Sequence, residues 1–196
     1  MSQNTVIHRI VRPAVRLIAP TRITPNHITT LRLATGLAAA FCFARGTAGA
    51  LAVGAAIFLL SLLLDRADGE LARQTGRMSR AGHRYDLAAD CIASVAAFVG
   101  LGIGLIGSHG SAALWTGVVA GIGIGTLFAE LNVINIAQVR GLDLSDGITV
   151  DPDDAMVLVP LLIWGGLAWP MTIAAAVITP VAALVLALLA LRSRRR

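Results

Sequence analysis

Long apolar runs separated by short polar segments dominate the pattern of this chain. Six of these runs approach the ~20 residues that a helix needs to cross a bilayer. We predict membrane-spanning helices over residues 27–45, 48–73, 84–107, 111–139, 154–168 and 170–191. The fifth run is short and contains Pro160. The pattern therefore predicts an all-α integral membrane fold with six transmembrane helices.

The segment before the first predicted span has a different pattern. Within residues 5–18, apolar side chains fall on one helical face, and Arg9, Arg12 and Arg16 fall on the other. This arrangement is typical of an amphipathic helix that lies in the membrane interface. Pro13 is expected to kink or split this helix. An ordinary amphipathic core helix is the alternative.

Composition supports a single membrane domain. The chain has 196 residues, of which 56% are hydrophobic and 14% are charged, whereas a typical soluble domain is about 25% charged. All 16 basic residues are arginines, and most lie at the ends of apolar runs. This placement argues against nucleic-acid binding. We expect one domain over residues 1–196, with an interfacial helix and linker at 1–22 and a six-helix bundle at 23–196.

The arginines also predict the orientation of the chain in the membrane, because cytoplasmic loops are rich in basic residues. With the N-terminus inside, the opposite side receives only Arg45. We therefore expect both termini to be cytoplasmic and the protein to lie in the inner (plasma) membrane. The cytoplasmic side then receives the N-terminal arginines together with Arg73, Arg77, Arg80, Arg84, Arg140 and Arg192 to Arg196.

Glycines recur at four-residue spacing in the third and fourth predicted spans. Gly100 is followed by Gly104, and Gly117 by Gly121. This spacing lets membrane helices approach each other closely. We interpret this spacing as a feature of helix packing that does not indicate a catalytic role.

Four aspartates lie where the second predicted span ends and the third begins. Asp65 and Asp68 are three residues apart, and Asp86 and Asp90 are four apart, so each pair shares a helix face. Because the loop 74–83 is short, we expect an antiparallel hairpin in which the two faces meet. A charge at membrane depth costs ~2.5–3.5 kcal/mol, so these carboxylates need compensation. Oxygen-only ligands favour Mg²⁺, Mn²⁺ or Ca²⁺ over zinc, and Mg²⁺ is the usual ion for phosphoryl chemistry.

Neighbouring residues suit a phosphate-bearing ligand. Gly69 follows Asp68 directly and leaves the backbone accessible, and Ala72 keeps the same patch open. Arg73 lies one turn beyond Gly69, where a guanidinium can hold a phosphate. Gly82 opens the turn into the third span. Taken singly, Gly69 would more often be a packing glycine, and Arg73 would be an arginine that anchors the topology on the cytoplasmic side.

Together these positions resemble the signature of the CDP-alcohol phosphotransferase family, Asp-x2-Asp-Gly-x2-Ala-Arg-x8-Gly-x3-Asp-x3-Asp. The resemblance implies that an alcohol attacks a CDP-linked lipid, such as CDP-diacylglycerol, and that CMP leaves as a phosphodiester forms. It also implies a role in phospholipid biosynthesis and a homodimer among membrane lipids. All eight fixed positions are present: Asp65, Asp68, Gly69, Ala72, Arg73, Gly82, Asp86 and Asp90.

The resemblance also implies a role for each residue. Two Mg²⁺ or Mn²⁺ ions would be held against the pyrophosphate by Asp65, Asp68 and Asp86. Asp90 would deprotonate the acceptor hydroxyl and contact a second metal. The CDP-linked lipid would bind at Asp65, Asp68, Gly69, Ala72, Arg73 and Gly82.

Residues outside the signature extend this hypothesis. In relatives, a sequence similar to Pro-Asn-x-x-Thr lies beside the nucleotide, which here indicates Asn26 and Thr29; helix capping is the alternative. Arg77, Arg80 and Arg84 would bind the phosphate of an anionic acceptor, or else anchor the topology and contact lipid headgroups.

Glu130 is expected to line the acceptor pocket or to pair with an arginine, because a glutamate within a span is a functional candidate. The acidic stretch 143–154 is interpreted as a solvated loop, and no pattern identifies the acceptor alcohol. A small membrane transporter or metal-ion carrier is the alternative function, since it too would use intramembrane aspartates. Such a protein would not need Gly69 and Arg73 at fixed offsets.

Overall fold

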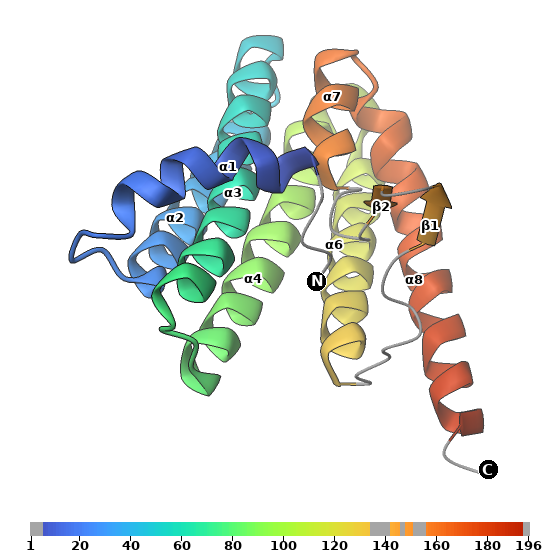
Figure 1. Cartoon of the computed structure of the whole chain (residues 1–196). Helices are drawn as coiled ribbons and strands as arrows, with labels where there is room; N and C mark the ends of the chain where they lie inside the picture. The colour runs from blue at the N-terminus through green and yellow to red at the C-terminus, as the bar shows by residue number, and fades with distance from the viewer. Residues whose placement is uncertain (1–5, 134–141, 146–147, 151–155, 194–196) are drawn as a thin grey trace.

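The computed structural model describes residues 6–133, 142–145, 148–150 and 156–193 (Figure 1). The first three helices are α1 (Val6–Ile18), α2 (Pro25–Ala44) and α3 (Ala48–Thr75). They are followed by α4 (Arg80–Gly104), the short α5 (Ile106–His109) and α6 (Ser111–Val133). A small antiparallel ribbon of β1 (Leu142–Ser145) and β2 (Ile148–Val150) precedes α7 (Leu158–Trp164) and α8 (Ala168–Ser193).

Five of the described helices are long and apolar enough to cross a membrane, namely α2, α3, α4, α6 and α8. The predicted all-α membrane fold is confirmed, but the count of six spans is not reproduced. The expected span 154–168 is represented by α7, a helix of 7 residues, while residues 151–155 lie outside the described part. The helix ends where Gly166 adopts a φ of 74°, a backbone conformation that favours glycine.

The long helices pack through small side chains. α2 packs against α3 and α4, α4 packs against α6, and α6 packs against α8. At the crossing of α4 and α6, a Cβ on Gly117 would lie 2.7 Å from Cα of Gly102. Gly100 faces the backbone of Ala40 in the same way. The glycine spacing in these spans therefore does allow close packing of helices.

The helix α1 runs crosswise to the long helices (Figure 1) and packs against α3. Val11 and Val15 are buried against Leu71 of α3. Pro13 lies within the helix and does not split it. Leu17 is 78% exposed, so α1 also presents an apolar side chain away from the protein. This is the arrangement expected of an amphipathic helix shared between the protein and the membrane interface.

The helix α8 presents an apolar surface along its length. Few of its residues are buried. In the most apolar 18-residue stretch of α8, only 6% of the residues are buried inside the protein. A surface of this kind suits contact with lipid tails and would promote aggregation in water. The exposed residues on α8 include Val177, Ile178, Val181, Leu184 and Leu188.

Candidate active site

A tight turn between α3 and α4 brings the two aspartate pairs to one end of the bundle. Gly76 caps α3 with a φ of 66°, which favours glycine. The hydroxyl of Ser79 then accepts a hydrogen bond of 3.0 Å from the N–H of Gly82 at the start of α4. The chain therefore reverses between Gly76 and Ser79, close to the predicted loop.

The two aspartate faces meet, and a third helix, α2, packs against both helices that carry them. Helix α2 packs extensively against both α3 and α4, whereas α3 and α4 touch each other little. The predicted convergence of the two aspartate faces is supported, because oxygens of Asp65, Asp68 and Asp86 lie within 4.8 Å of one another. The sequence did not predict that α2 also supplies side chains to this site.

Three carboxylates form the centre of the site. One oxygen from each of Asp65, Asp68 and Asp86 lies within 4.8 Å of the others. Asp68 is buried at 3% exposure, and the other two are partly buried. Oxygens on opposite sides of one Mg²⁺ lie about 4.2 Å apart. The donor set is oxygen-only and has the dimensions that hard divalent cations require, so these residues fit the expected metal ions.

Asp90 extends the cluster one helical turn along α4. Its side chain is 19% exposed, and its Oδ1 accepts a hydrogen bond from Nη2 of Arg32. Arg32 belongs to α2 and also lies 3.3 Å from Asp65, measured from Nε to Oδ1. Sequence analysis missed this arginine. The available signal was a charged residue inside a predicted span, which is by default a functional candidate.

Thr29 and Asn26 bring the start of α2 to the site. The hydroxyl of Thr29 donates a 2.7 Å hydrogen bond to Oδ2 of Asp68, and this bond is buried. Asn26 lies beside the start of α4, where a Cβ on Gly82 would be 3.2 Å from its Oδ1. Capping does not explain Asn26, because Thr24 occupies the N-cap position of α2.

The remaining signature residues line an open patch on α3. A Cβ on Gly69 would have only one neighbouring atom, Nη1 of Arg73, at 4.0 Å. Ala72 is partly buried on the same helix. The Arg73 guanidinium donates to Oε2 of Glu70, with Nη2 at 2.9 Å. Arg73 is therefore already held by a carboxylate of its own helix.

The residues proposed for the acceptor differ in their exposure. Arg77, Arg80 and Arg84 are exposed on the turn and on the first residues of α4. Glu130 lies near the end of α6 and is partly buried. Its Oε2 is buried without a hydrogen-bond partner among the described residues. The acidic stretch 143–154 lies largely outside the residues whose side chains the structure describes.

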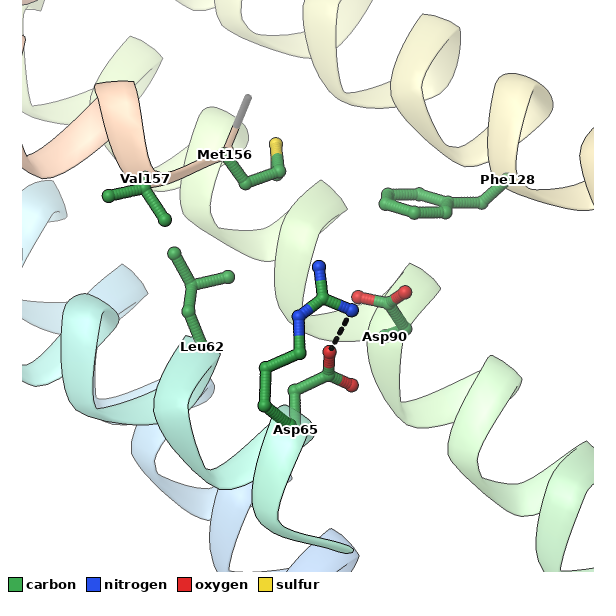
Figure 2. A pocket seen from close by; sticks show the side chains of 7 residues that line it. Leu62, Asp65, Asp90, Phe128, Met156 and Val157 are labelled. Atoms are coloured by element: carbon green, nitrogen blue, oxygen red, sulfur yellow. Dashed lines mark ion pairs between the residues drawn. The ribbon is translucent and has the colours of Figure 1, made fainter. Parts of the chain in front are cut away.

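A pocket adjoins the aspartates, and Figure 2 shows Asp65 and Asp90 reaching toward each other from two helices. Its walls combine charged and apolar side chains. The dashed line in Figure 2 marks the 3.6 Å ion pair between Asp65 and Arg66. Its lining residues are Leu62, Asp65, Arg66, Asp90, Phe128, Met156 and Val157.

Comparison with known proteins gives a consistent result. The family model described as CDP-alcohol phosphatidyltransferase matches residues 22–188. None of the curated proteins matches the chain in sequence.

Solved structures share the fold. A crystal structure of Mycobacterium tuberculosis phosphatidylinositol phosphate synthase with CDP-DAG bound matches with a TM-score of 0.69 at 21% identity. The match covers 94% of this chain and 92% of that chain. The same synthase in complex with manganese and citrate matches with a TM-score of 0.66 at 22% identity, over 92% of this chain and 86% of that chain.

Proposed function

Because the chain belongs to the CDP-alcohol phosphatidyltransferase family, we propose that it transfers a phosphatidyl-type group from CDP-diacylglycerol to an acceptor alcohol. CMP is the second product, and the reaction serves phospholipid biosynthesis. The observation that carries this proposal is the grouping of Asp65, Asp68 and Asp86 beside a pocket with both charged and apolar walls. The solved relative with CDP-DAG bound supports the choice of donor.

We assign Asp65, Asp68 and Asp86 as the residues that would hold two Mg²⁺ or Mn²⁺ ions, with Asp90 contacting the second. When bound, such ions neutralise phosphate charge and stabilise the leaving CMP. The oxygen-only donor set supports this assignment. The manganese complex of the solved relative is consistent with it.

Asp90 is proposed as the general base. An alcohol is a weak nucleophile at neutral pH and needs a base within hydrogen-bond reach. The Asp90 carboxylate lines the pocket and takes the hydroxyl proton. The alcohol oxygen bonds to the lipid-bearing phosphorus, and the bond from that phosphorus to the CMP oxygen breaks.

The donor nucleotide is assigned to the open patch and the adjacent helix start. The space above Gly69 allows a ligand to approach the backbone of α3. Arg73 carries the charge needed for a phosphate. For the acceptor, the exposed arginines at positions 77, 80 and 84 suit an anionic alcohol, and the buried Glu130 oxygen suits a hydroxyl donor. The other proposed donor-binding residues are Asp65, Asp68, Ala72, Gly82, Asn26 and Thr29.

The proposed setting is a homodimer in the inner (plasma) membrane. We propose that residues 1–196 form a single domain with both termini and the site on the cytoplasmic side. A site at this position meets a lipid donor from the bilayer and a polar acceptor from water.

The test is an assay of purified full-length protein with CDP-diacylglycerol, Mg²⁺ and a panel of alcohols. CMP release and a new lipid in the mass spectrum are expected with one acceptor, and none with EDTA. Asp90→Asn is expected to abolish turnover and to retain CDP-diacylglycerol binding, while Asp143→Asn serves as a control in the β1 strand. Metal transport into proteoliposomes without CMP release would instead favour the carrier function.

A further inference from the structure

Arg32 occupies the middle of the aspartate site. Its side chain is 2% exposed, and its guanidinium approaches carboxylates from two different helices. Nε lies 3.3 Å from Asp65 and Nη1 lies 3.7 Å from Asp86, while Nη2 bonds to Asp90. One guanidinium therefore contacts three of the four signature aspartates.

The backbone of Arg32 is fixed, whereas its side chain is long and flexible. Its carbonyl oxygen accepts a 3.0 Å hydrogen bond from the buried hydroxyl of Ser61 in α3. One turn later, a Cβ on Gly36 would lie 2.6 Å from Cβ of Ala93 in α4. Helix α2 is thus held closely between α3 and α4 at this level, and the guanidinium can move without moving the helix.

The contacts of Arg32 are uneven in quality. Nε is close to Asp65 but makes no hydrogen bond among the described residues. Asp68, by contrast, is held by Thr29. The attraction between Arg32 and Asp65 is therefore mainly Coulombic and lacks the directional bond that would fix it.

We propose that Arg32 is the resident counter-charge of the aspartate site. It is a positioning residue that orients Asp65, Asp86 and Asp90 before divalent cations bind and that releases carboxylate oxygens to those cations. The inference rests on the proposed function, because it uses the same metal site. Arg32 and the divalent cations both use the carboxylates of Asp65 and Asp86. The arginine and the cations therefore compete for these carboxylates.

The competition predicts opposite effects on cation affinity and on metal-free stability. Removing the guanidinium leaves the carboxylates uncompensated, so Arg32→Gln should bind Mn²⁺ more tightly, on the order of tenfold. The same variant should unfold at a lower temperature in EDTA and recover most of that loss at saturating Mn²⁺. A residue with only a structural role would not tighten cation binding.

The experiment measures free Mn²⁺ by electron paramagnetic resonance and thermal unfolding in detergent, using the full chain. Arg32→Lys retains the charge in a shorter side chain, so its Mn²⁺ affinity should fall between wild type and Arg32→Gln. Arg45→Gln alters an exposed arginine at the other end of α2 and is the matched control. Its affinity should equal that of wild type.

Unchanged or weaker Mn²⁺ binding by Arg32→Gln overturns the inference while leaving the proposed metal site intact. If Arg32→Gln does not fold, the lysine variant decides, and an affinity equal to wild type overturns the inference. Absence of Mn²⁺ binding by the wild-type protein overturns both the inference and the proposed metal role.

Discussion

Thr29 makes a direct and buried hydrogen bond between α2 and the aspartates. Its hydroxyl donates to Oδ2 of Asp68 at 2.7 Å, and the bond is shielded from solvent. A hydrogen bond to a charged group contributes about 1.5–3 kcal/mol to stability, and a buried acceptor left without a donor is costly. Thr29 therefore restrains Asp68 as well as stabilising it.

We expect Thr29→Val to lower the free energy of unfolding by about 1–3 kcal/mol. It should also lower turnover, because Asp68 would no longer be held in place for its ligand. Thr29→Ser keeps the hydroxyl and should remain close to wild type. The measurements are thermal unfolding in detergent and CMP release at several Mg²⁺ concentrations. Equal behaviour of the valine and serine variants would show that the hydroxyl is unimportant.

At the residue scale, the aspartate positions were predictable, and the side chain between them was not. Helical spacing alone places Asp65 with Asp68 and Asp86 with Asp90, because neighbours three or four residues apart share a face. The position of Arg32 inside the predicted span 27–45 marks it as a functional candidate, but it does not specify which groups the side chain contacts. Its partners lie 33 to 58 residues later in the chain, and no local pattern encodes such contacts.

At the element scale, α1 is linked to the site through Glu70 of α3. Nε of Arg12 lies 3.4 Å from Oε1 of Glu70. The same carboxylate accepts hydrogen bonds from Arg73 and Gln74. Because Glu70 is 8% exposed and has several partners, its loss should matter more than the loss of Arg12.

We expect Arg12→Gln to increase hydrogen exchange in α1 and to change global stability by only ~0–1 kcal/mol, as for most partly exposed ion pairs. Glu70→Gln should loosen α1 similarly and in addition raise the KM for CDP-diacylglycerol, because Arg73 loses its anchor. Arg16→Gln changes an exposed arginine on the same helix and is the control. An unchanged KM in Glu70→Gln would remove the proposed link between α1 and nucleotide binding.

The element boundaries were predictable where hydropathy changes sharply. The predicted spans 48–73 and 170–191 correspond closely to α3 and α8. Within the described residues 156–168, the predicted span 154–168 contains only the short helix α7, Leu158–Trp164. Hydropathy measures only how apolar a segment is and does not locate helix ends. Here two successive glycines after Trp164 end the helix. The insertion of α2 between α3 and α4 was also not predictable, because hydropathy does not specify neighbours.

At the scale of the whole molecule, the number of crossings fixes which ends of the helices lie together. Helices α6 and α8 pack side by side and run in the same direction (Figure 1). The end of α6 and the start of α8 therefore lie at opposite ends of the bundle (Figure 1). Five described helices meet the length and hydropathy requirements for a span, and the sixth passage that the sequence predicts would make the number of passages even.

An even number of passages predicts that both termini lie on one side, together with the turn at Ser79. The opposite side would carry α5, where Ser108 is exposed. In a chain with Cys42 and Cys91 replaced by serine, we expect Ser108→Cys in intact cells to react with a membrane-impermeant maleimide. Ser79→Cys should react only after the cells are opened, because the arginine-rich turn is cytoplasmic under the positive-inside rule. Labelling of Ser79→Cys in intact cells would reverse the orientation and place the aspartates on the outer side, where a cytoplasmic CDP-linked donor could not reach them.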